Sequence, residues 1–271
     1  KGILAICLLL SLCAPPVALY LRRILRSRIE TRQEVERITD VPVIGEISTS
    51  RSGKHLVVDS AETSSTAELF RLMRSNLLFV LTPPNEKVVL VTSASPGDGK
   101  SFIAINLAAS LALLGKRVLL VGMDIRKPRL AEYLGISPRL GLTQFAASAD
   151  MKVSDIIVHE PNMPGLDVIA AGPVPPNPGE LLTSHRIDHL FTELRKDYDY
   201  IIVDSAPVGR VSDTYALDRI SDAAIFVCRV GNTSLSDMHI ADEIREQHRL
   251  KKLSIAVNGT PARRTYGYGE K

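Results

Sequence analysis

The sequence predicts an α/β fold, in which helices flank a parallel sheet and a transmembrane helix precedes it. From residue 87 onward, apolar segments alternate with stretches of helical pattern. The apolar segments are rich in Val, Ile and Leu throughout, as are strands that are covered on both faces. Strands that alternate with helices form parallel sheets through right-handed crossovers. Ligands of such sheets bind at the carboxyl ends of the strands, so a functional site is expected there.

The elements are expected at defined positions along the chain. Six strands are expected at 87–92, 117–122, 166–170, 199–204, 223–229 and 252–257. Helices are expected at 66–81, 100–114, 184–196, 212–220 and 235–249. Before them, the pattern is typical of a charged helix at 22–40, an extended segment at 41–45 and a linker at 48–64 that is rich in Ser, Thr and Gly.

The composition is that of a globular protein with one apolar segment added. Of the 271 residues, 45% are hydrophobic and 23% are charged. Lys and Arg total 33 against 30 acidic residues, and a net charge of +3 does not favour a nucleic-acid partner. The three cysteines have no metal-binding spacing, which is typical of a reduced, cytosolic protein.

The apolar segment at 2–21 predicts a transmembrane helix. Its 20 residues carry no charge and match the roughly 20 that cross a bilayer core. Six arginines against three glutamates follow at 22–37, so the positive-inside rule places the rest of the chain in the cytoplasm. A buried core helix is the alternative. Because the chain opens without Met inside this segment, we expect it to be the C-terminal part of a longer protein.

The strongest motif is Ser-Ala-Ser-Pro-Gly-Asp-Gly-Lys-Ser at 93–101, between an expected strand and an expected helix. That context is typical of a P-loop, whose glycines let backbone N–H groups turn inward around phosphates. The helix N-terminus adds to the attraction for anions. Lys100 would neutralise the β- and γ-phosphates and Ser101 would bind Mg²⁺. Ala94 stands where the first glycine of the motif is usual, and its small size is compatible with the loop.

Two further strands end in carboxylates. Asp204 ends the apolar run 200–204 about 100 residues after the P-loop, where a carboxylate reaches the metal. Asp124 follows the run 119–122 and precedes Arg126, which places both near the phosphates. The alternative for Asp124 and Arg126 is a solvated charge cluster at a plain strand end.

Glu68, Arg71 and Arg74 share one face of the expected helix 66–81, opposite its apolar face. From spacing alone, an intrahelical Glu–Arg pair explains them. At the C-terminus, Tyr266 and Tyr268 are separated by glycine and cannot build a core. A tyrosine on such a tail can enter the active site of another molecule, or the tail has no function.

Together these residues resemble the bacterial tyrosine kinases of capsule and exopolysaccharide assembly, which are related to the partitioning ATPases. The resemblance covers nearly the whole chain. It includes the P-loop, acidic motifs like 119–126 and 200–204, the helix with Glu68, Arg71 and Arg74, and the stretch 172–182. Tyr266 and Tyr268 match the terminal tyrosine cluster of the family. The apolar N-terminal segment is similar to the last span of the chain-length determinant that is often fused ahead of the kinase.

The resemblance implies a P-loop NTPase-like fold and an ATP-dependent protein-tyrosine autokinase with Mg²⁺ that regulates polysaccharide polymerisation and export. The implied catalytic residues are Lys100, Asp124, Arg126 and Asp204, and the implied metal ligands are Ser101, Asp204 and Asp124. ATP is expected at Ser95, Pro96, Gly97, Asp98, Gly99, Lys100, Ser101 and Phe102, and at Asn258, which in the partitioning relatives contacts adenine.

The resemblance also implies partners and organisation. Glu68, Arg71 and Arg74 would assemble copies of the chain into a ring, and Tyr266 and Tyr268 would be phosphorylated by a neighbouring copy. Polysaccharide polymerase and export proteins, a protein-tyrosine phosphatase and the bacterial inner membrane are the other expected partners. The expected division is a transmembrane helix at 1–21, a juxtamembrane helix and linker at 22–64, a cytoplasmic kinase domain at 65–260 and a tail at 261–271.

One position departs from the family pattern. The second motif normally reads Asp-x-Asp-x-Arg, but its first position here is Gly122. That acid is a candidate base for the attacking tyrosine, and loss of a general base typically costs about 10²- to 10⁴-fold in rate. Asp124 could take the role. Two rival functions therefore stay open: a partitioning-type ATPase switch, and a non-catalytic scaffold gated by nucleotide.

Overall fold

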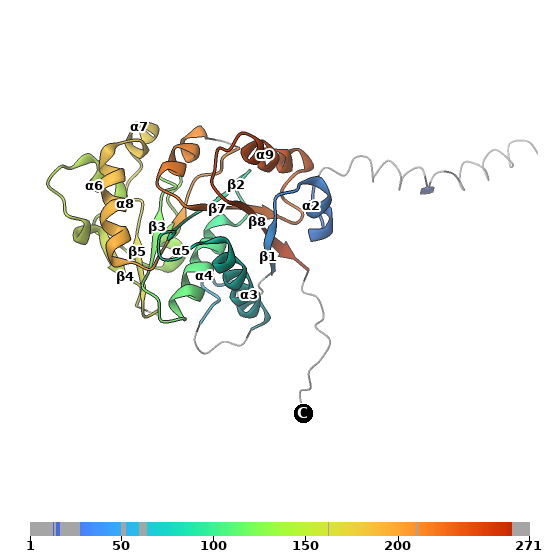
Figure 1. Cartoon of the computed structure of the whole chain (residues 1–271), viewed down its shortest axis with the longest axis horizontal. Helices are drawn as coiled ribbons and strands as arrows, with labels where there is room; N and C mark the ends of the chain where they lie inside the picture. Colours follow the sequence, from blue (N-terminus) through green and yellow to red (C-terminus); the bar gives the residue numbers. More distant parts are fainter. Residues whose placement is uncertain are drawn as a thin grey trace, which may run out of the picture.

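The computed structural model describes residue 13, residues 15–16 and the ranges 28–49, 53–59, 64–161, 163–209 and 211–261 (Figure 1). Most of the predicted transmembrane segment lies outside these residues, as do Tyr266 and Tyr268 of the tail. Across the described ranges, no helix has both the length and the apolar character needed to cross a bilayer.

An eight-stranded sheet forms the centre of the fold, in the order β1-β8-β7-β2-β6-β3-β5-β4. Its strands are β1 Val43–Ser48, β2 Val88–Ser93, β3 Val118–Gly122, β4 Ile157–His159, β5 Leu166–Ile169, β6 Tyr200–Asp204, β7 Ala223–Arg229 and β8 Leu253–Thr260. Each of the six expected strands is present within a few residues of its expected bounds. The neighbouring strands are parallel, except that the edge strand β4 is antiparallel to β5. The short strand β4 lacks the apolar run that marked the others.

The helices are α2 Arg32–Ile38, α3 Ser65–Val80, α4 Lys100–Ala112, α5 Leu130–Leu134, α6 Leu142–Ala147, α7 Pro178–Leu182, α8 His185–Asp197 and α9 Leu235–Glu246, with 3₁₀ helices η1 Val153–Ile156 and η2 Ser212–Arg219. The charged helix expected at 22–40 begins at Arg32 in the described part, because the Thr31 side chain caps its N-terminus. The helix expected at 212–220 is 3₁₀. The short helices α5, α6 and α7 were not predicted.

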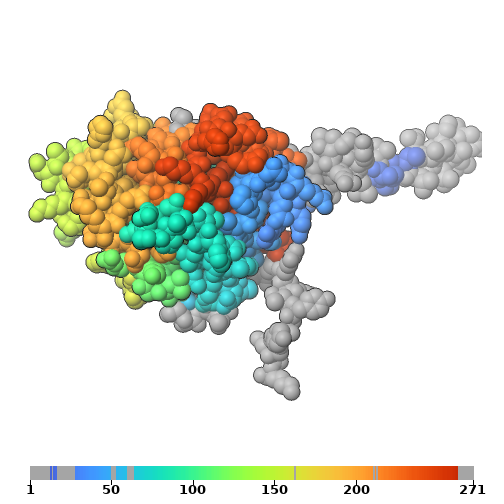
Figure 2. All heavy atoms as spheres, viewed as in Figure 1, coloured from blue at the N-terminus to red at the C-terminus, as the bar shows by residue number. Residues whose placement is uncertain are grey.

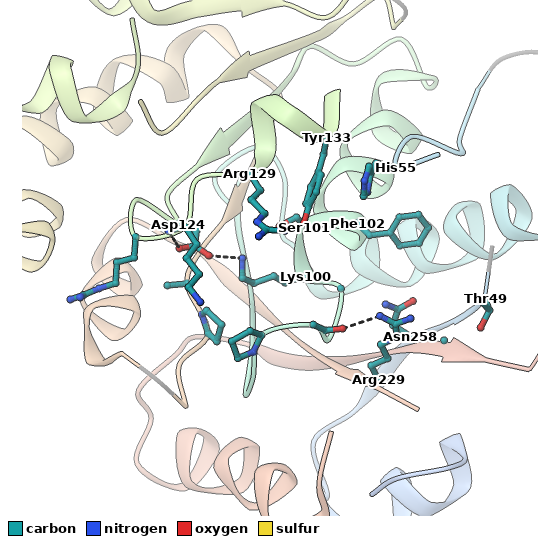
Figure 3. A pocket seen from close by; sticks show the side chains of 18 of the residues that line it. Thr49, His55, Lys100, Ser101, Phe102, Asp124, Arg129, Tyr133, Arg229 and Asn258 are labelled. Atoms are coloured by element: carbon teal, nitrogen blue, oxygen red, sulfur yellow. Dashed lines mark hydrogen bonds and ion pairs between the residues drawn. The ribbon is translucent and has the colours of Figure 1, made fainter. Parts of the chain in front are cut away.

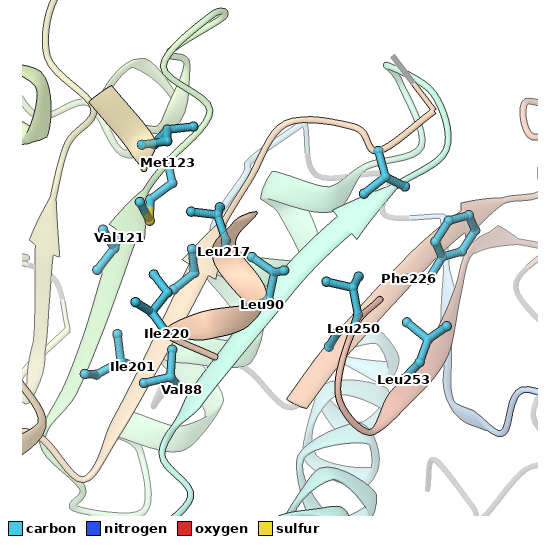
Figure 4. Close-up of a cluster of buried hydrophobic side chains, with 14 of the residues drawn as sticks. Val88, Leu90, Val121, Met123, Ile201, Leu217, Ile220, Phe226, Leu250 and Leu253 are labelled. Carbon is cyan, nitrogen blue, oxygen red and sulfur yellow. The ribbon is translucent and has the colours of Figure 1, made fainter. Parts of the chain in front are cut away.

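Two hydrophobic layers cover the sheet, one on each face. Along β2, Val88 and Leu90 belong to one cluster, whereas Val89 and Val91 belong to the other. This alternation follows from the two-residue period of a strand. Figure 4 shows Leu90 of the first cluster with Phe226 and other apolar side chains, and α3 and α4 pack over the second cluster (Figure 1). Because both faces are covered, the polar groups at the strand ends are the natural place for a site.

Residues before the expected start of the main domain belong to the same core. The strand β1 pairs in parallel with β8, and Figure 2 shows the blue N-terminal residues beside the red C-terminal ones. Within the expected linker, Val57 and Val58 are buried. Their backbone N–H groups donate to the Asn106 side chain of α4 at 2.7 and 3.1 Å. The packed fold thus includes described residues of the ranges 28–49 and 53–59, before the expected boundary at residue 65.

An ion pair fixes the start of β2, the strand that leads into the P-loop. The guanidinium of Arg195 donates to both carboxylate oxygens of Asp222, at 2.8 and 2.9 Å. Asp222 also accepts from the backbone N–H groups of Lys87 and Val88, each at 2.8 Å. Burial by itself raises the pKa of Asp222. These hydrogen bonds and the charge of Arg195 lower the pKa by more than burial raises it, so the net shift is downward.

We expect Asp222→Asn to weaken the dependence of stability on acid. Because the pKa of Asp222 is lowered by folding, its contribution is present above the ordinary Asp pKa of about 4 and is lost as pH falls through the lowered value. At pH 7 the variant should lose roughly 1.5–3 kcal/mol of unfolding free energy, the range for hydrogen bonds to a charged group. Urea unfolding from pH 7 to pH 3 measures this. Asp150→Asn, at an exposed position, is the control. Parallel pH profiles for wild type and Asp222→Asn would contradict the assignment.

Candidate functional site

The P-loop connects the end of β2 at Ser93 to the start of α4 at Lys100. Gly97 and Gly99 have φ values of +93° and +92°, in the left-handed region that side chains with a Cβ avoid. The backbone turns at these two glycines, directly before the N-terminus of α4. A run of backbone N–H groups before a helix is an anion-binding geometry, so the loop has the form that the sequence predicted.

The buried Asp98 carboxylate anchors the P-loop from behind. It accepts hydrogen bonds from the Thr233 hydroxyl at 2.7 Å, the Asn232 amide at 2.8 Å and the backbone N–H of Ser95 at 3.0 Å. Burial raises its pKa, although these hydrogen bonds act in the opposite direction. Asp98 and Ser95, both expected to contact a cofactor, do not line the cavity described below. The Asp98 side chain instead holds the loop against the segment between β7 and α9.

Lys100 lies between two carboxylates. Its Nζ donates to Asp124 Oδ2 at 2.9 Å and lies 3.4 Å from Asp204 Oδ1. Burial lowers the pKa of Lys100, but the charges of Asp204 and Asp124 outweigh burial and the net shift is upward. Burial raises the pKa of Asp204, and Lys100 opposes that shift. Lys100 is therefore held as a cation at the base of the site.

Sheet register brings the two carboxylates together. β3 and β6 are neighbours, and Gly122 is paired with Asp204. The Asp204 carbonyl accepts from the N–H groups of Met123 and Asp124, at 2.7 and 3.1 Å. Asp124 is only 9% exposed, so it belongs to the site rather than to the solvated charge cluster that was its alternative.

A cavity of about 920 Å³ opens above the P-loop (Figure 3). Of the predicted site residues it is lined by Pro96, Gly97, Gly99, Lys100, Ser101, Phe102, Asp124, Arg126 and Asn258. The basic residues among the described lining are Lys54, Lys100, Arg126, Lys127, Arg129 and Arg229, against the single acid Asp124. An excess of cations in a cavity attracts polyanions such as nucleotide phosphates.

Two predicted residues have partners that the sequence did not indicate. Arg126 donates from Nε and Nη2 to Asp213 of η2, at 3.1 and 2.5 Å, so its guanidinium points to that helix. The amide of Asn258, at the end of β8, donates to the backbone carbonyl of Asp98 at 2.9 Å. Asn258 thus supports the P-loop while also lining the cavity.

Ser101, Asp124 and Asp204 have the chemistry that suits Mg²⁺. Mg²⁺ is usually held by one or two carboxylates together with substrate phosphates. The Ser101 hydroxyl acts to lower the pKa of Asp204, and the charged neighbours of Asp204 are Lys100 and Asp124. The described residues include no group of three or more His, Cys, Asp and Glu side chains that could enclose a metal. An open pair of carboxylates with one hydroxyl therefore fits a metal that arrives with phosphates.

Several cavity residues were not predicted. Arg229 ends β7, donates to the Gly97 carbonyl at 3.0 Å and lines the cavity; its place at the carboxyl end of a strand beside β2 was a usable signal. Arg129 and Tyr133 follow the Asp124 motif; Arg129 directly precedes the short helix α5 and Tyr133 lies within it. His55 lies in the expected linker, where no sequence signal indicated a site.

On α3, the three predicted assembly residues do not share one exposed face. Glu68 pairs with Arg71, as the intrahelical alternative expected. Arg74 turns inward and donates to the Ser110 carbonyl of α4 at 2.6 Å. Burial, together with the charge of Arg71, lowers the pKa of Arg74. Leu72 and Phe79 of the same helix are 58% and 90% exposed.

Replacing Gly99 by Ala should destabilise the protein more than the same change at Gly115. Both glycines have positive φ, which costs roughly 1–2 kcal/mol for other residues. A Cβ at Gly99 would lie 2.1 Å from Asn258 Nδ2, whereas a Cβ at Gly115 meets nothing within 4 Å. The excess, about 1 kcal/mol for a lost hydrogen bond, should be visible in urea unfolding. Equal losses of unfolding free energy for the two variants would show that the Asn258 side chain moves aside without destabilising the protein.

Comparison with known proteins agrees with this geometry. Residues 86–255 match the family described as AAA domain. The tyrosine-protein kinase YwqD of Bacillus subtilis is 34% identical over 222 residues, which cover 81% of this chain and 92% of YwqD. The chain spans about a third of the length of the two EpsB proteins of Ralstonia that it matches, 31% and 36%.

Solved structures of kinase domains share the fold. The chimerical protein CapA2B2 superposes with a TM-score of 0.77 at 31% identity, covering 85% of this chain and all of that one. The kinase domain of the Escherichia coli tyrosine kinase ETK gives a TM-score of 0.77 at 26% identity, covering 90% of this chain and 99% of that domain. With a P-loop, two converging carboxylates and relatives of this extent, the chain belongs to the family of bacterial tyrosine-protein kinases.

Proposed function

We propose that this chain is the catalytic region of a protein-tyrosine autokinase that uses ATP and Mg²⁺ and regulates capsular or exopolysaccharide polymerisation and export. The observation that carries the proposal is Lys100, held between Asp124 and Asp204 at the base of a cavity rich in cations. The names of the relatives support the reaction type.

ATP would bind with its triphosphate along residues 95–102. The N–H groups of the loop and the N-terminus of α4 would hold the phosphate oxygens. Lys100 would move from the carboxylates toward the β- and γ-phosphates, since a triphosphate offers it more negative charge. Asn258 and Arg229, at the ends of β8 and β7, would lie toward the nucleoside. Ser101 and Asp204 would hold Mg²⁺, which neutralises charge on the phosphates when bound, and Asp124 would serve as the base.

The transfer step joins a tyrosine of a second copy to the γ-phosphorus. The phenolic oxygen of Tyr266 or Tyr268 forms a bond to phosphorus, and the bond from phosphorus to the bridging β,γ-oxygen breaks. The phenolic proton passes to the Asp124 carboxylate, and ADP leaves with the bridging electrons. Lys100 and Arg126 stabilise the charge on the transferring group, for which Arg126 must leave Asp213.

Assembly and location follow the same proposal. Copies of the chain would form a ring in which α3 carries the contact, with Glu68, Arg71 and Arg74 ordering that helix. The exposed Leu72 and Phe79 support a protein contact on α3, because large exposed apolar side chains favour interfaces. Polysaccharide polymerase and export proteins would be partners, and a protein-tyrosine phosphatase would reverse the mark. The segment 2–21 would anchor the chain in the bacterial inner membrane, with the kinase domain in the cytoplasm.

The two rivals make different products. A partitioning-type ATPase would release phosphate without phosphotyrosine, and a scaffold would bind ATP without forming either. The relatives named as tyrosine-protein kinases favour the autokinase over both rivals. The scaffold hypothesis still needs a test, because Gly122 stands where the family motif has an acid.

Lys100→Met should abolish phosphotyrosine formation, with a loss of at least about 10²-fold, because the cation that stabilises the transferring phosphoryl group is gone. Immunoblotting for phosphotyrosine after incubation with ATP and Mg²⁺ measures this. Tyr266→Phe/Tyr268→Phe should also show no phosphotyrosine, although its active site is intact. Phosphotyrosine on Lys100→Met in a preparation without other kinases would overturn the proposal.

A mixture of these two variants is the matched control for transfer between copies. Lys100→Met carries an acceptor tail without a working site, and Tyr266→Phe/Tyr268→Phe carries the reverse. Phosphotyrosine should therefore reappear on Lys100→Met in the mixture. A mixture that stays blank, beside a wild type that is labelled, would show that transfer occurs within one copy.

Gly122→Asp should speed transfer if the missing acid limits the rate. A Cβ at this position would meet Leu130 Cδ2 at 3.2 Å and the Ala171 backbone N at 3.3 Å, so these neighbours must shift by a few tenths of an ångström. We expect a rise of about 10²-fold or more, the lower end of what a general base supplies. Gly122→Ala reproduces the crowding without the carboxylate and should not speed transfer. Equal rates for the two variants would show that Asp124 already suffices.

A further inference from the structure

One wall of the cavity takes no part in the reaction described above. His55 and Tyr133 stack there with ring centroids 3.9 Å apart and planes 22° from parallel. The guanidinium of Arg129 interacts with the Tyr133 hydroxyl, and this interaction raises the pKa of Arg129. All three residues line the same cavity as Lys100, and Figure 3 shows them together above Lys100, apart from Asn258 and Arg229 below it.

The wall is fixed relative to the P-loop helix. Asn106 of α4 accepts from the N–H groups of Val57 and Val58 and donates to the His55 carbonyl at 2.7 Å. Asn106 is fully buried, and α4 begins at Lys100, so one helix positions both His55 and the reactive lysine. On the other side, Asp124 Oδ1 accepts from the Lys127 N–H at 3.1 Å, which ties the segment leading to α5 to the carboxylate that contacts Lys100.

Strand order decides which ligand can reach this wall. The strand β2 has β7 and β8 on one side and β6 and β3 on the other. Asn258 and Arg229 are on the β7–β8 side, toward which the nucleoside would extend. In phosphoryl transfer the attacking and leaving oxygens are roughly in line, so the acceptor must approach the γ-phosphorus from the opposite side. That is the β6–β3 side, where Asp124 leads to Arg129 and Tyr133.

We propose that His55, Arg129 and Tyr133 form the docking site for the acceptor, a tyrosyl side chain on an extended peptide. The proposal rests on the tyrosine-kinase function above and assigns the residues that select and position its substrate. The incoming ring packs against the exposed part of the Tyr133–His55 pair, and Arg129 faces the phenolic oxygen before transfer and the phosphate after it. Docking forms no covalent bond and changes only the position of the phenol.

The chemistry of the wall favours tyrosine over serine. Aromatic pairs contribute about 0.5–1.5 kcal/mol beyond the area they bury, and a serine offers no ring. Asp124 and Asp204 are 9% and 2% exposed, so the hydroxyl must reach inward, which a long phenol does more readily than a short serine side chain. The cavity, at about 920 Å³, is near the top of the roughly 300–1,000 Å³ range of small-molecule pockets, which leaves room beside a nucleotide.

The test uses the full chain with Tyr266→Phe/Tyr268→Phe, so that its own tail does not compete, and a peptide of residues 265–271, Thr-Tyr-Gly-Tyr-Gly-Glu-Lys. Tyr133→Ala and His55→Ala should each raise the KM for the peptide about 5- to 10-fold. The Kd of a non-hydrolysable ATP analogue should change by no more than about twofold. Tyr133→Phe keeps the ring and should restore the KM. Arg129→Gln should lower kcat/KM, whereas Arg139→Gln, a nearby exposed arginine outside this cavity, should not.

Two outcomes would overturn the docking site. If wild type and Tyr133→Ala have equal KM values for the peptide, Tyr133 has no role in docking the acceptor. If Tyr133→Ala weakens binding of the ATP analogue as much as it raises the KM for the peptide, the wall binds adenine instead. Equilibrium binding of the same peptide, measured with the analogue present, decides the docking site without catalysis. If the protein with an unaltered site transfers no phosphate to the peptide, the proposed function fails. Even then, loss of peptide binding in Tyr133→Ala would support the docking site.

Discussion

The site depends on one electrostatic arrangement, a buried lysine between two buried carboxylates. Each charge alone would be costly to remove from water, and together they are held only because their geometry is close. Lys100 is 2.9 Å from Asp124 and 3.4 Å from Asp204. Three different segments supply these groups, so the parallel register of β2, β6 and β3 must be kept for the arrangement to exist. A phosphate ligand that attracts Lys100 leaves both carboxylates available for a metal.

Side-chain anchors hold the P-loop in place from behind and from one side. The buried Asp98 ties it to Thr233 and Asn232, ahead of α9, and Asn258 ties it to the end of β8. The neighbouring segment also binds the first described part of the chain, because Ile29 and Thr233 share a backbone hydrogen bond of 3.0 Å. Residues close to the predicted membrane segment are therefore packed directly against the support of the nucleotide site. In such a fold, the loop conformation depends on long-range contacts as much as on its own glycines.

The position of β2 divides the cavity into two sides with different chemistry. Amide and arginine groups at the ends of β8 and β7 lie on one side, and the carboxylates and the His55–Tyr133 stack lie on the other. A reaction between two ligands that meet end to end needs this separation, because donor and acceptor approach the phosphorus from opposite directions. Asn106 ties His55 on the second side to the P-loop helix α4.

The sequence alone determined the strand-helix alternation, the P-loop and the two carboxylates, because each is a local pattern with a direct physical cause. Apolar runs mark strands that are buried on both faces, and glycines before Lys100 mark a phosphate turn. It could not place Arg126 against Asp213, turn Arg74 inward to Ser110, or bring His55 beside Tyr133, because these contacts join segments far apart in the chain. Val57 and Val58 were hidden in a stretch of linker-like composition. Only the tertiary structure decided which polar side chains face the cavity, since that depends on the packing of neighbouring elements.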